Sequence, residues 1–336
     1  MRHAFVIVLE GTLSFRFRDP YPELLILSWI INGEIEMTSE PNMTKPTTMA
    51  EAVCRLGARF VAALGVSLLA AATTASGRTV DASPWDGDSR GAARLIAGNA
   101  VGASDAPIVR AGIEIRLGPG WKTYWRYPGD AGVPPIFDFA RSGNVKAITV
   151  LWPAPHRFSI EGATSIGYKG NVILPLRVVP QNPGQPVVLR LKLGYGICEK
   201  LCVPAEAEAE LVLSGAASSH ERALAAAEAR VPKPSALGED RAFAIRAVRR
   251  ETGSTRPRIV IDVSAPATAS VDIFAEGPTP DWALPLPEPV SAAPTGLRRF
   301  VFELDGLPSG AKPEGVMLKL TAVSGEDAIQ VSIPVD

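Results

Sequence analysis

The chain has 336 residues, of which 46% are hydrophobic and 21% charged, and its formal net charge is −1. This length accommodates two globular domains, and the near-neutral charge gives no electrostatic reason to expect a nucleic-acid partner. Three scattered histidines, His3, His156 and His220, are too few for a histidine-based metal centre. We expect neither a metal ion nor another cofactor.

Residues 49–77 have the order of features that is typical of a secretory signal peptide. Arg55 and Arg59 form a short basic region, Phe60–Ala72 is apolar, and small residues surround Ala75. The apolar run is shorter than the roughly 20 residues of a membrane span. A buried helix is the alternative interpretation, but the residues that follow are polar and rich in turn formers.

Residues 1–48 are interpreted as an over-extended and disordered N-terminus. A signal peptide works at the true start of a chain, so we expect translation to begin at Met43 or Met49. The alternative is a genuine N-terminal extension with an uncleaved anchor. Cleavage of the signal peptide would also remove Cys54.

Residues 84–215 are predicted to form a first β-sandwich. Apolar and polar residues alternate over Val109–Leu117, which is typical of a half-buried strand. Strand-like runs follow over residues 145–152, 171–179 and 186–197, with turn residues between them. Short strands without an intervening helical pattern indicate an antiparallel sandwich.

A helical linker is predicted over residues 216–238, and a second β-sandwich over residues 239–336. Ser218 or Ser219 is the expected N-cap of the helix, and Pro232 is its expected stop. The last segment repeats the strand and turn spacing without a cysteine. The predicted fold class is therefore all-β, with two sandwiches joined by a short helix.

The stretch Leu191–Leu211 predicts a β-hairpin with two cysteines at its tip. With Cys198 opposite Cys202, Lys192 falls opposite Glu208, and apolar residues pair on the other face. A slip of one residue would destroy both matches. Both cysteines fall on the polar face, so the pair is expected to be exposed to solvent.

Pro204 supports this register, because proline has no N–H and suits a pair that exchanges no ladder hydrogen bonds. Such pairs bring Cα atoms to about 4.5 Å, within disulfide range. A loop this short contributes about 2 kcal/mol of chain entropy, so exchange suits the pair better than a structural role. Lys200 in the loop favours a thiolate, whereas Glu199 opposes it. A structural hairpin disulfide is the alternative.

Four blocks around this pair occur in order, at residues 118–135, 152–158, 166–176 and 194–211. The first reads GPGWKTYWRYPGDAGVPP and the second WPAPHRF. Together the blocks resemble the N-terminal periplasmic domain of the thiol:disulfide interchange protein DsbD, especially its ScsB-like branch, over about residues 95–214. The helix and the second sandwich resemble the extended N-terminal region of that branch.

The resemblance implies immunoglobulin-like sandwiches, a periplasmic location, and a redox-active pair formed by Cys198 and Cys202. In that family the pair takes electrons from a membrane-embedded thiol reductase. It passes them through mixed disulfides to periplasmic thioredoxin-like or disulfide-bearing proteins. The sequence after the pair contains no long apolar run and no C-x-x-C motif, so a separate membrane partner is expected.

Family members also cover the pair with a cap segment, for which residues 156–168 are the best match, with Phe158 as a lid. Large aromatic side chains in a sandwich are more often core residues. The residues expected to flank the site are Tyr124, Trp125, His156, Phe158, Tyr168, Tyr195 and Lys200.

Two other functions stay open at this stage. Two thiolates suit Cu(I), which would make the protein a periplasmic copper-binding protein. The chain would otherwise be a non-catalytic binding module with a structural disulfide.

Overall fold

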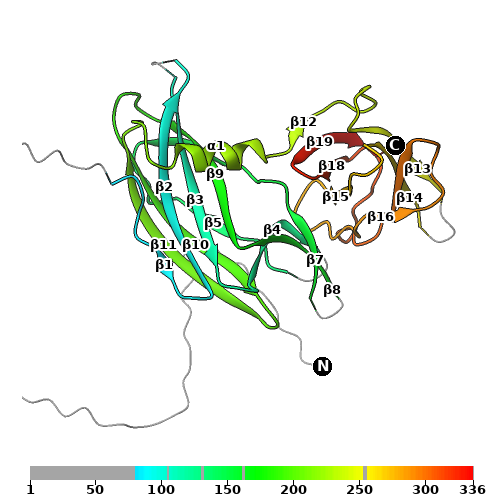
Figure 1. Ribbon diagram of the computed structural model, residues 1–336, viewed down its shortest axis with the longest axis horizontal. Coiled ribbons are helices and arrows are strands. Elements are labelled where there is room, and N and C mark those ends of the chain that lie inside the picture. Colours follow the sequence, from blue (N-terminus) through cyan, green and yellow to red (C-terminus); the bar gives the residue numbers. More distant parts are fainter. Residues whose placement is uncertain (1–79, 104–105, 130–131, 161–162, 253–255, 336) are drawn as a thin grey trace, which may run out of the picture. The chain divides into compact units, whose positions relative to one another are not determined.

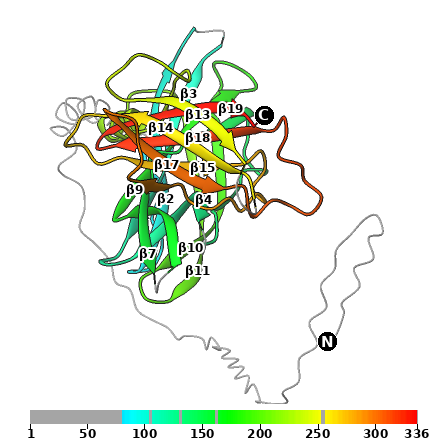
Figure 2. The same ribbon diagram turned by 90° about the vertical axis from the view of Figure 1, so that its right-hand side faces the viewer.

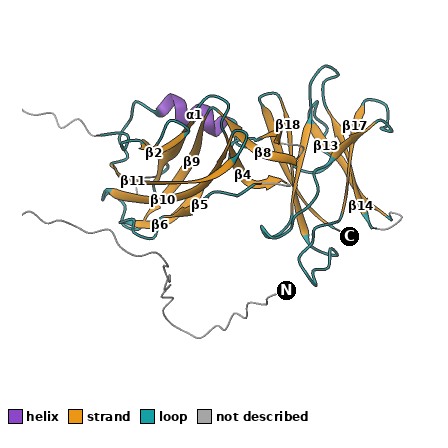
Figure 3. Cartoon of the chain, turned by 90° about the horizontal axis from the view of Figure 1, so that it is seen from below, coloured by secondary structure: helices purple, strands orange, loops and turns teal. Residues whose placement is uncertain are grey.

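The computed structural model describes residues 80–335 except 104–105, 130–131, 161–162 and 253–255. The described residues fall within one compact unit. They form two immunoglobulin-like β-sandwiches with one α-helix between them in the sequence, so the predicted fold class is confirmed (Figures 1 and 3). The predictions for residues 1–48 and 49–77 lie outside the described residues. No helix in the described ranges is long and apolar enough to cross a membrane.

The first sandwich contains a five-stranded sheet in the order β1-β2-β3-β9-β6 and a six-stranded sheet in the order β11-β10-β4-β8-β7. In the second sheet, β5 also pairs with β10. The strands of the first sheet are β1 (Asp86–Gly87), β2 (Gly91–Val101), β3 (Ile108–Leu117), β6 (Val145–Val150) and β9 (Asn171–Pro180). Those of the second are β4 (Lys122–Gly129), β5 (Ile136–Asp138), β7 (His156–Ile160), β8 (Ala163–Lys169), β10 (Val187–Cys198) and β11 (Cys202–Leu213).

The long hairpin of β10 and β11 has the predicted register (Figure 1). Cys198 is opposite Cys202, and Lys192 is opposite Glu208, to which it forms an ion pair of 2.9 Å. The apolar residues of β10 alternate with these polar ones and are buried between the two sheets. On the outer edge of β11, the carboxylate of Asp86 accepts a hydrogen bond from the backbone N–H of Glu208 at 2.7 Å.

Helix α1 (Glu221–Ala229) begins one residue after His220, so the predicted serine N-cap is wrong. Ser218 instead donates its hydroxyl hydrogen bond to the carbonyl of Ala97, and Ser219 donates to Asp81. Both hydroxyls therefore connect the loop before the helix to the first sandwich, and the Ser218 oxygen also accepts a hydrogen bond from the backbone N–H of His220 at 3.0 Å.

The helix packs on the five-stranded sheet of the first sandwich and does more than link two domains (Figures 1 and 3). Its Leu224 is fully buried over Gly98 and Gly112. A Cβ at either glycine would lie 2.7 or 2.8 Å from a Leu224 methyl carbon, so only glycine leaves room for that side chain. Arg110 of β3 forms ion pairs with Glu221 and Glu228 on the helix.

The second sandwich has two four-stranded sheets, in the orders β12-β19-β18-β15 and β13-β14-β17-β16 (Figure 2). The strands are β12 (Lys233–Pro234), β13 (Ala244–Glu251), β14 (Arg258–Ser264), β15 (Asp272–Glu276), β16 (Glu288–Val290), β17 (Leu297–Glu303), β18 (Met317–Ser324) and β19 (Asp327–Pro334).

Alternate residues of β15 contact the strands of the first sandwich. Asp272 forms an ion pair with Arg157 of β7, and Glu276 forms one with Arg126 of β4. Between them, the ring of Phe274 lies 5.8 Å from that of Trp125, centroid to centroid. The second sandwich therefore contacts two of the strands that also build the surroundings of the cysteines.

Candidate redox site

Cys198 and Cys202 form a disulfide across the tip of the β10–β11 hairpin, with Cα atoms 4.2 Å apart. The register places the two residues directly opposite each other, with three residues in the connecting loop. That loop faces solvent, and Leu201 within it is 74% exposed. The disulfide therefore sits where the end of a β-ribbon reaches the molecular surface.

The two cysteines differ in burial. Cys202 is exposed, as expected from the sequence, but Cys198 is completely buried, so the prediction of a pair exposed at both positions is wrong. The physical reason is the neighbouring strand: β10 lies between β11 and β4, and the Tyr124 hydroxyl group of β4 lies 2.7 Å from the sulfur of Cys198, whereas β11 is at the edge of the sheet. An attacking group can therefore approach the sulfur of Cys202 and not that of Cys198.

Tyr124 of β4 places its hydroxyl group against both sulfur atoms. Its Oη lies 2.7 Å from Sγ of Cys198 and 3.0 Å from Sγ of Cys202. Burial raises the pKa of this phenol above its ordinary value of 10.0, which keeps it protonated at neutral pH. A protonated phenol can donate a hydrogen bond to a thiolate formed on either sulfur.

The ring of Tyr124 is held between two glycines. A Cβ on Gly132 would lie 2.6 Å from two ring carbons, and a Cβ on Gly196 would lie 2.9 Å from another. The backbone can approach the ring from both sides only because neither position has a side chain. This contact fixes the direction in which the hydroxyl group points.

Two lysines and Phe158 lie beside the disulfide. Lys122 is opposite Cys198 on one side and opposite Lys169 of β8 on the other. The Nζ atoms of the two lysines lie 5.7 and 5.8 Å from the centroid of the Phe158 ring, which is buried. Phe158 is thus close to the site, while its role as a lid stays a prediction.

An apolar groove of about 450 Å³ opens beside Cys202. Tyr124, Val133 and Ile136 line one part of it, and Pro204 with its β11 neighbours lines another. Val133 is 58% exposed and Ile136 is 68% exposed, which is unusual for large apolar side chains. The exposed sulfur therefore has an apolar surface on one side and the two lysines across the sheet on the other.

Three of the expected aromatic residues are core residues, although Tyr195 also borders the apolar groove beside Cys202. Trp125 packs against Phe274 and under the guanidinium of Arg126. Tyr168 is buried and donates its hydroxyl hydrogen bond to the carbonyl of Pro153 at 2.8 Å. Tyr195 is also buried, and this burial raises its pKa to about 12.

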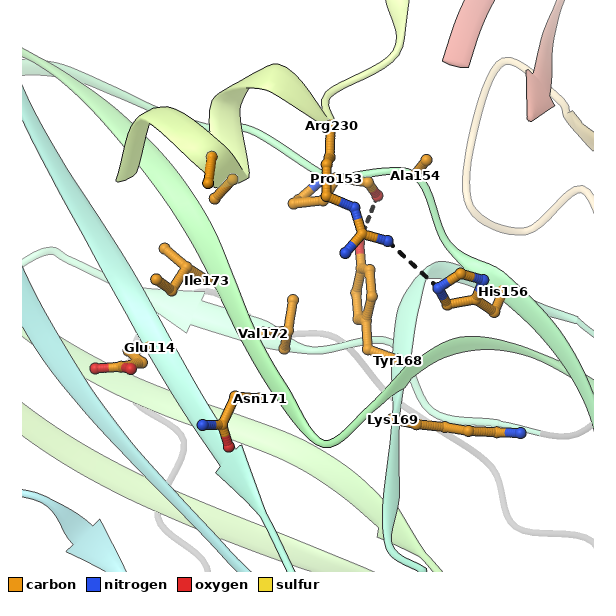
Figure 4. Close-up of a pocket in the computed structure, with 12 residues that line it drawn as sticks. Glu114, Pro153, Ala154, His156, Tyr168, Lys169, Asn171, Val172, Ile173 and Arg230 are labelled. Carbon is orange, nitrogen blue, oxygen red and sulfur yellow. Dashed lines mark hydrogen bonds between the residues drawn. The ribbon is translucent and has the colours of Figure 1, made fainter. Parts of the chain in front are cut away.

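His156 and Lys200 occupy different surroundings. His156 lines a pocket of about 210 Å³ with Tyr168 and Arg230, and neither cysteine contributes to it (Figure 4). Burial first, and then the positive charge of Arg230, lower the pKa of His156 below 6.5, so its ring is neutral at pH 7. Lys200 is exposed in the hairpin loop and has no ion pair among the described residues.

Three residues of the site were not predicted from the sequence, namely Lys122, Lys169 and Gly132. A signal was present for Lys122, because alternation in GWKTYW places Lys122 and Tyr124 on one face of a strand. The pairing of β4 with β8, which adds Lys169, depends on strand order and is not encoded in any short stretch. Within the described ranges, no group of three or more His, Cys, Asp or Glu residues is arranged to hold a metal ion.

Comparisons with known proteins agree with this geometry. Residues 94–214 match the family model described as "Thiol:disulfide interchange protein DsbD, N-terminal". The crystal structure of the N-terminal periplasmic domain of ScsB from Proteus mirabilis is similar, with 22% sequence identity and a TM-score of 0.59. That match covers 76% of this chain and 98% of the other chain. A search of curated proteins finds no match. The resemblance predicted from the sequence blocks is confirmed.

Proposed function

We propose that this DsbD-like chain is a periplasmic dithiol–disulfide exchange protein in which Cys198 and Cys202 are the reacting residues. The observation that carries the proposal is a disulfide with one exposed and one buried sulfur, both in contact with the Tyr124 hydroxyl group. The matched family region, residues 94–214, includes both cysteines. A structural staple would not need one accessible sulfur beside a hydrogen-bond donor.

The difference in burial between the two cysteines supports an order of reaction. In the reduced protein, the thiolate of Cys202 attacks one sulfur of a substrate disulfide, and the other substrate sulfur leaves as a thiolate. The thiolate of Cys198 then attacks Sγ of Cys202 in the mixed disulfide, and the substrate leaves with both its cysteines reduced. Two electrons have passed to the substrate, and Cys198–Cys202 is a disulfide again.

The same steps in reverse order return the protein to its reduced form. A thiolate of a reduced partner attacks the exposed Sγ of Cys202, and Cys198 leaves as a thiolate that accepts a hydrogen bond from Tyr124. The partner's second thiolate then releases Cys202. We propose a membrane-embedded thiol reductase as this electron donor, and thioredoxin-like or other disulfide-bearing periplasmic proteins as recipients. Residues 49–77 would direct export as a signal peptide.

Single-cysteine variants test this order. Cys198→Ser leaves the exposed nucleophile without its resolving thiol, so it should accumulate mixed disulfides in periplasmic extract, detected as reductant-sensitive bands. Cys202→Ser should trap far less, because its remaining thiol is buried. Equal trapping by both variants would contradict the assigned order, and absence of trapping by both would contradict exchange.

The reduction potential separates exchange from a structural role. We expect a value above −300 mV in defined thiol–disulfide buffers, because structural disulfides in exported proteins lie below about that value. A lower potential, together with no trapped partner, would favour the structural interpretation.

A further inference from the structure

Lys122 and Lys169 form a pair of like charges that the described part of the protein does not neutralise. They are directly opposite each other on neighbouring strands, an arrangement that destabilises a sheet. Neither forms an ion pair with a described acidic residue, although Arg190 and Lys192 on the adjacent hairpin each have a glutamate partner. Contact of both ammonium groups with the Phe158 ring offsets only part of the repulsion.

This lysine pair lies next to the reacting sulfurs. Lys122 is the direct cross-strand neighbour of Cys198. Lys169 borders the pocket of Figure 4, but its side chain extends away from Asn171, and its ammonium nitrogen lies near Phe158. The two ammonium groups therefore place positive charge on one side of the disulfide, and the apolar groove lies on the other side.

The nearby carboxylates are placed elsewhere. Glu199 lies over the turn at Gly120, with its Cγ 3.3 Å from where a Cβ of that glycine would be. Glu206 lines the apolar groove. Glu114 borders the same pocket as Lys169, but its carboxylate is already paired with Arg94 at 2.7 Å.

We propose that the Lys122–Lys169 pair is a docking element that selects partner proteins with acidic side chains beside their own reactive cysteine. This inference rests on the proposed exchange function and adds the charge of the partner to it. A carboxylate between the two ammonium groups would relieve their repulsion and would steer the partner's sulfur towards Cys202. The alternative role of the lysines is to stabilise the thiolate of Cys198, which would not depend on the charge of the partner.

Small disulfides of different charge distinguish these roles. The full chain with Cys54→Ser, so that only Cys198 and Cys202 can react, is reduced and mixed with 3,3′-dithiodipropionate (anionic), 2-hydroxyethyl disulfide (neutral) or cystamine (cationic). The second-order rate constants are measured at low salt, and this protein is the unchanged reference for the lysine variants. We expect the ratio of the anionic to the cationic rate constant to fall about tenfold in Lys122→Gln/Lys169→Gln. Lys192→Gln, which changes a paired lysine on the same sheet, should leave the ratio unchanged.

Two further measurements make the result decisive. Lys122→Arg/Lys169→Arg keeps both positive charges, so it should have the ratio of the unchanged protein. In the unchanged protein, 0.5 M salt should lower the ratio, and this measurement does not depend on whether the glutamine variant folds. Equal slowing of all three reactions would overturn the docking role in favour of thiolate stabilisation. Failure of the unchanged protein to react with any of the three disulfides would instead contradict the exchange function, and the inference with it.

Discussion

The guanidinium group of Arg157 donates hydrogen bonds to both carboxylate oxygens of Asp272, at 2.8 and 3.4 Å. It also donates to the carbonyl of Pro287 at 2.9 Å and to Glu288. All of these acceptors belong to the second sandwich, while Arg157 is the residue before Phe158. The hairpin predicted as a cap is thus bound to the second sandwich one residue away from the ring that contacts both lysines.

Arg157→Gln is expected to loosen this hairpin. Because Asp272 is half-buried, and burial already raises its pKa, loss of its partner should lower the free energy of unfolding by about 2 kcal/mol. Hydrogen–deuterium exchange should become faster in β7 and β8. Arg90→Gln, which breaks an exposed pair with Asp88, should leave the stability nearly unchanged, because solvent screens such a pair. Unchanged exchange in β7 would show that the contact does not hold the hairpin.

Tyr124→Phe is expected to weaken the thiolate of Cys198 without creating a cavity. The change removes the hydroxyl group beside both sulfurs and keeps the ring. The loss of one hydrogen bond to a charged sulfur disfavours the thiolate, so it should raise the pKa of the Cys198 thiol. Thiolate absorbance at 240 nm, followed against pH in the reduced protein, measures this shift.

Tyr168→Phe is the matched control for that experiment. It also removes a buried hydroxyl group, but one that donates to Pro153 in a pocket without cysteines. Equal titration curves for Tyr124→Phe and the unchanged protein would show that the phenol does not stabilise the thiolate.

Gly196→Ala is expected to displace the Tyr124 ring, because the new Cβ would lie 2.9 Å from a ring carbon. We expect destabilisation by about 1–3 kcal/mol, as for other overpacked sites, together with a raised thiol pKa. Gly194→Ala on the same strand meets no atom within 4 Å and serves as the control. Denaturant unfolding of the two variants provides the comparison. Similar stabilities would mean that the ring is free to move.

Asp262 is expected to make the second sandwich sensitive to acid. Its buried carboxylate lies between Arg299 and Arg249, and the hydrogen bond from Arg299 is the main cause that lowers its pKa below 3.8. A carboxyl group whose pKa is lower in the folded state stabilises the protein above its unfolded pKa, and this contribution is lost as the pH falls through the folded pKa.

Asp262→Asn should therefore cost about 3 kcal/mol at pH 7, where an ion pair is broken, and progressively less below pH 4. Urea unfolding at pH 7, 4 and 3 measures the difference. A cost that does not change with pH would contradict the role of the charge.

The β10–β11 register was predictable because charge and apolar character alternate on both strands and agree at several positions, such as Lys192 with Glu208. The burial of Cys198 was not predictable from the sequence. It depends on the pairing of β10 with β4, which lies far from β10 in the sequence. Strand β2 was also missed, since its small residues have low strand propensity. Its Gly98 instead serves the packing of Leu224 from a helix far along the chain.

The outer edge of β11 has a consequence for how another protein can bind. Pro204 lacks an amide hydrogen, and Asp86 already occupies the amide of Glu208, which points outward in the same row. Two positions in this row therefore offer no free amide to a strand from another protein. Extension of the sheet by another chain at the edge of β11 is disfavoured for this reason. Under the proposed function, a partner at Cys202 would therefore be recognised by side chains that contact the face of the sheet. Its selection would depend on charge and shape rather than on main-chain pairing.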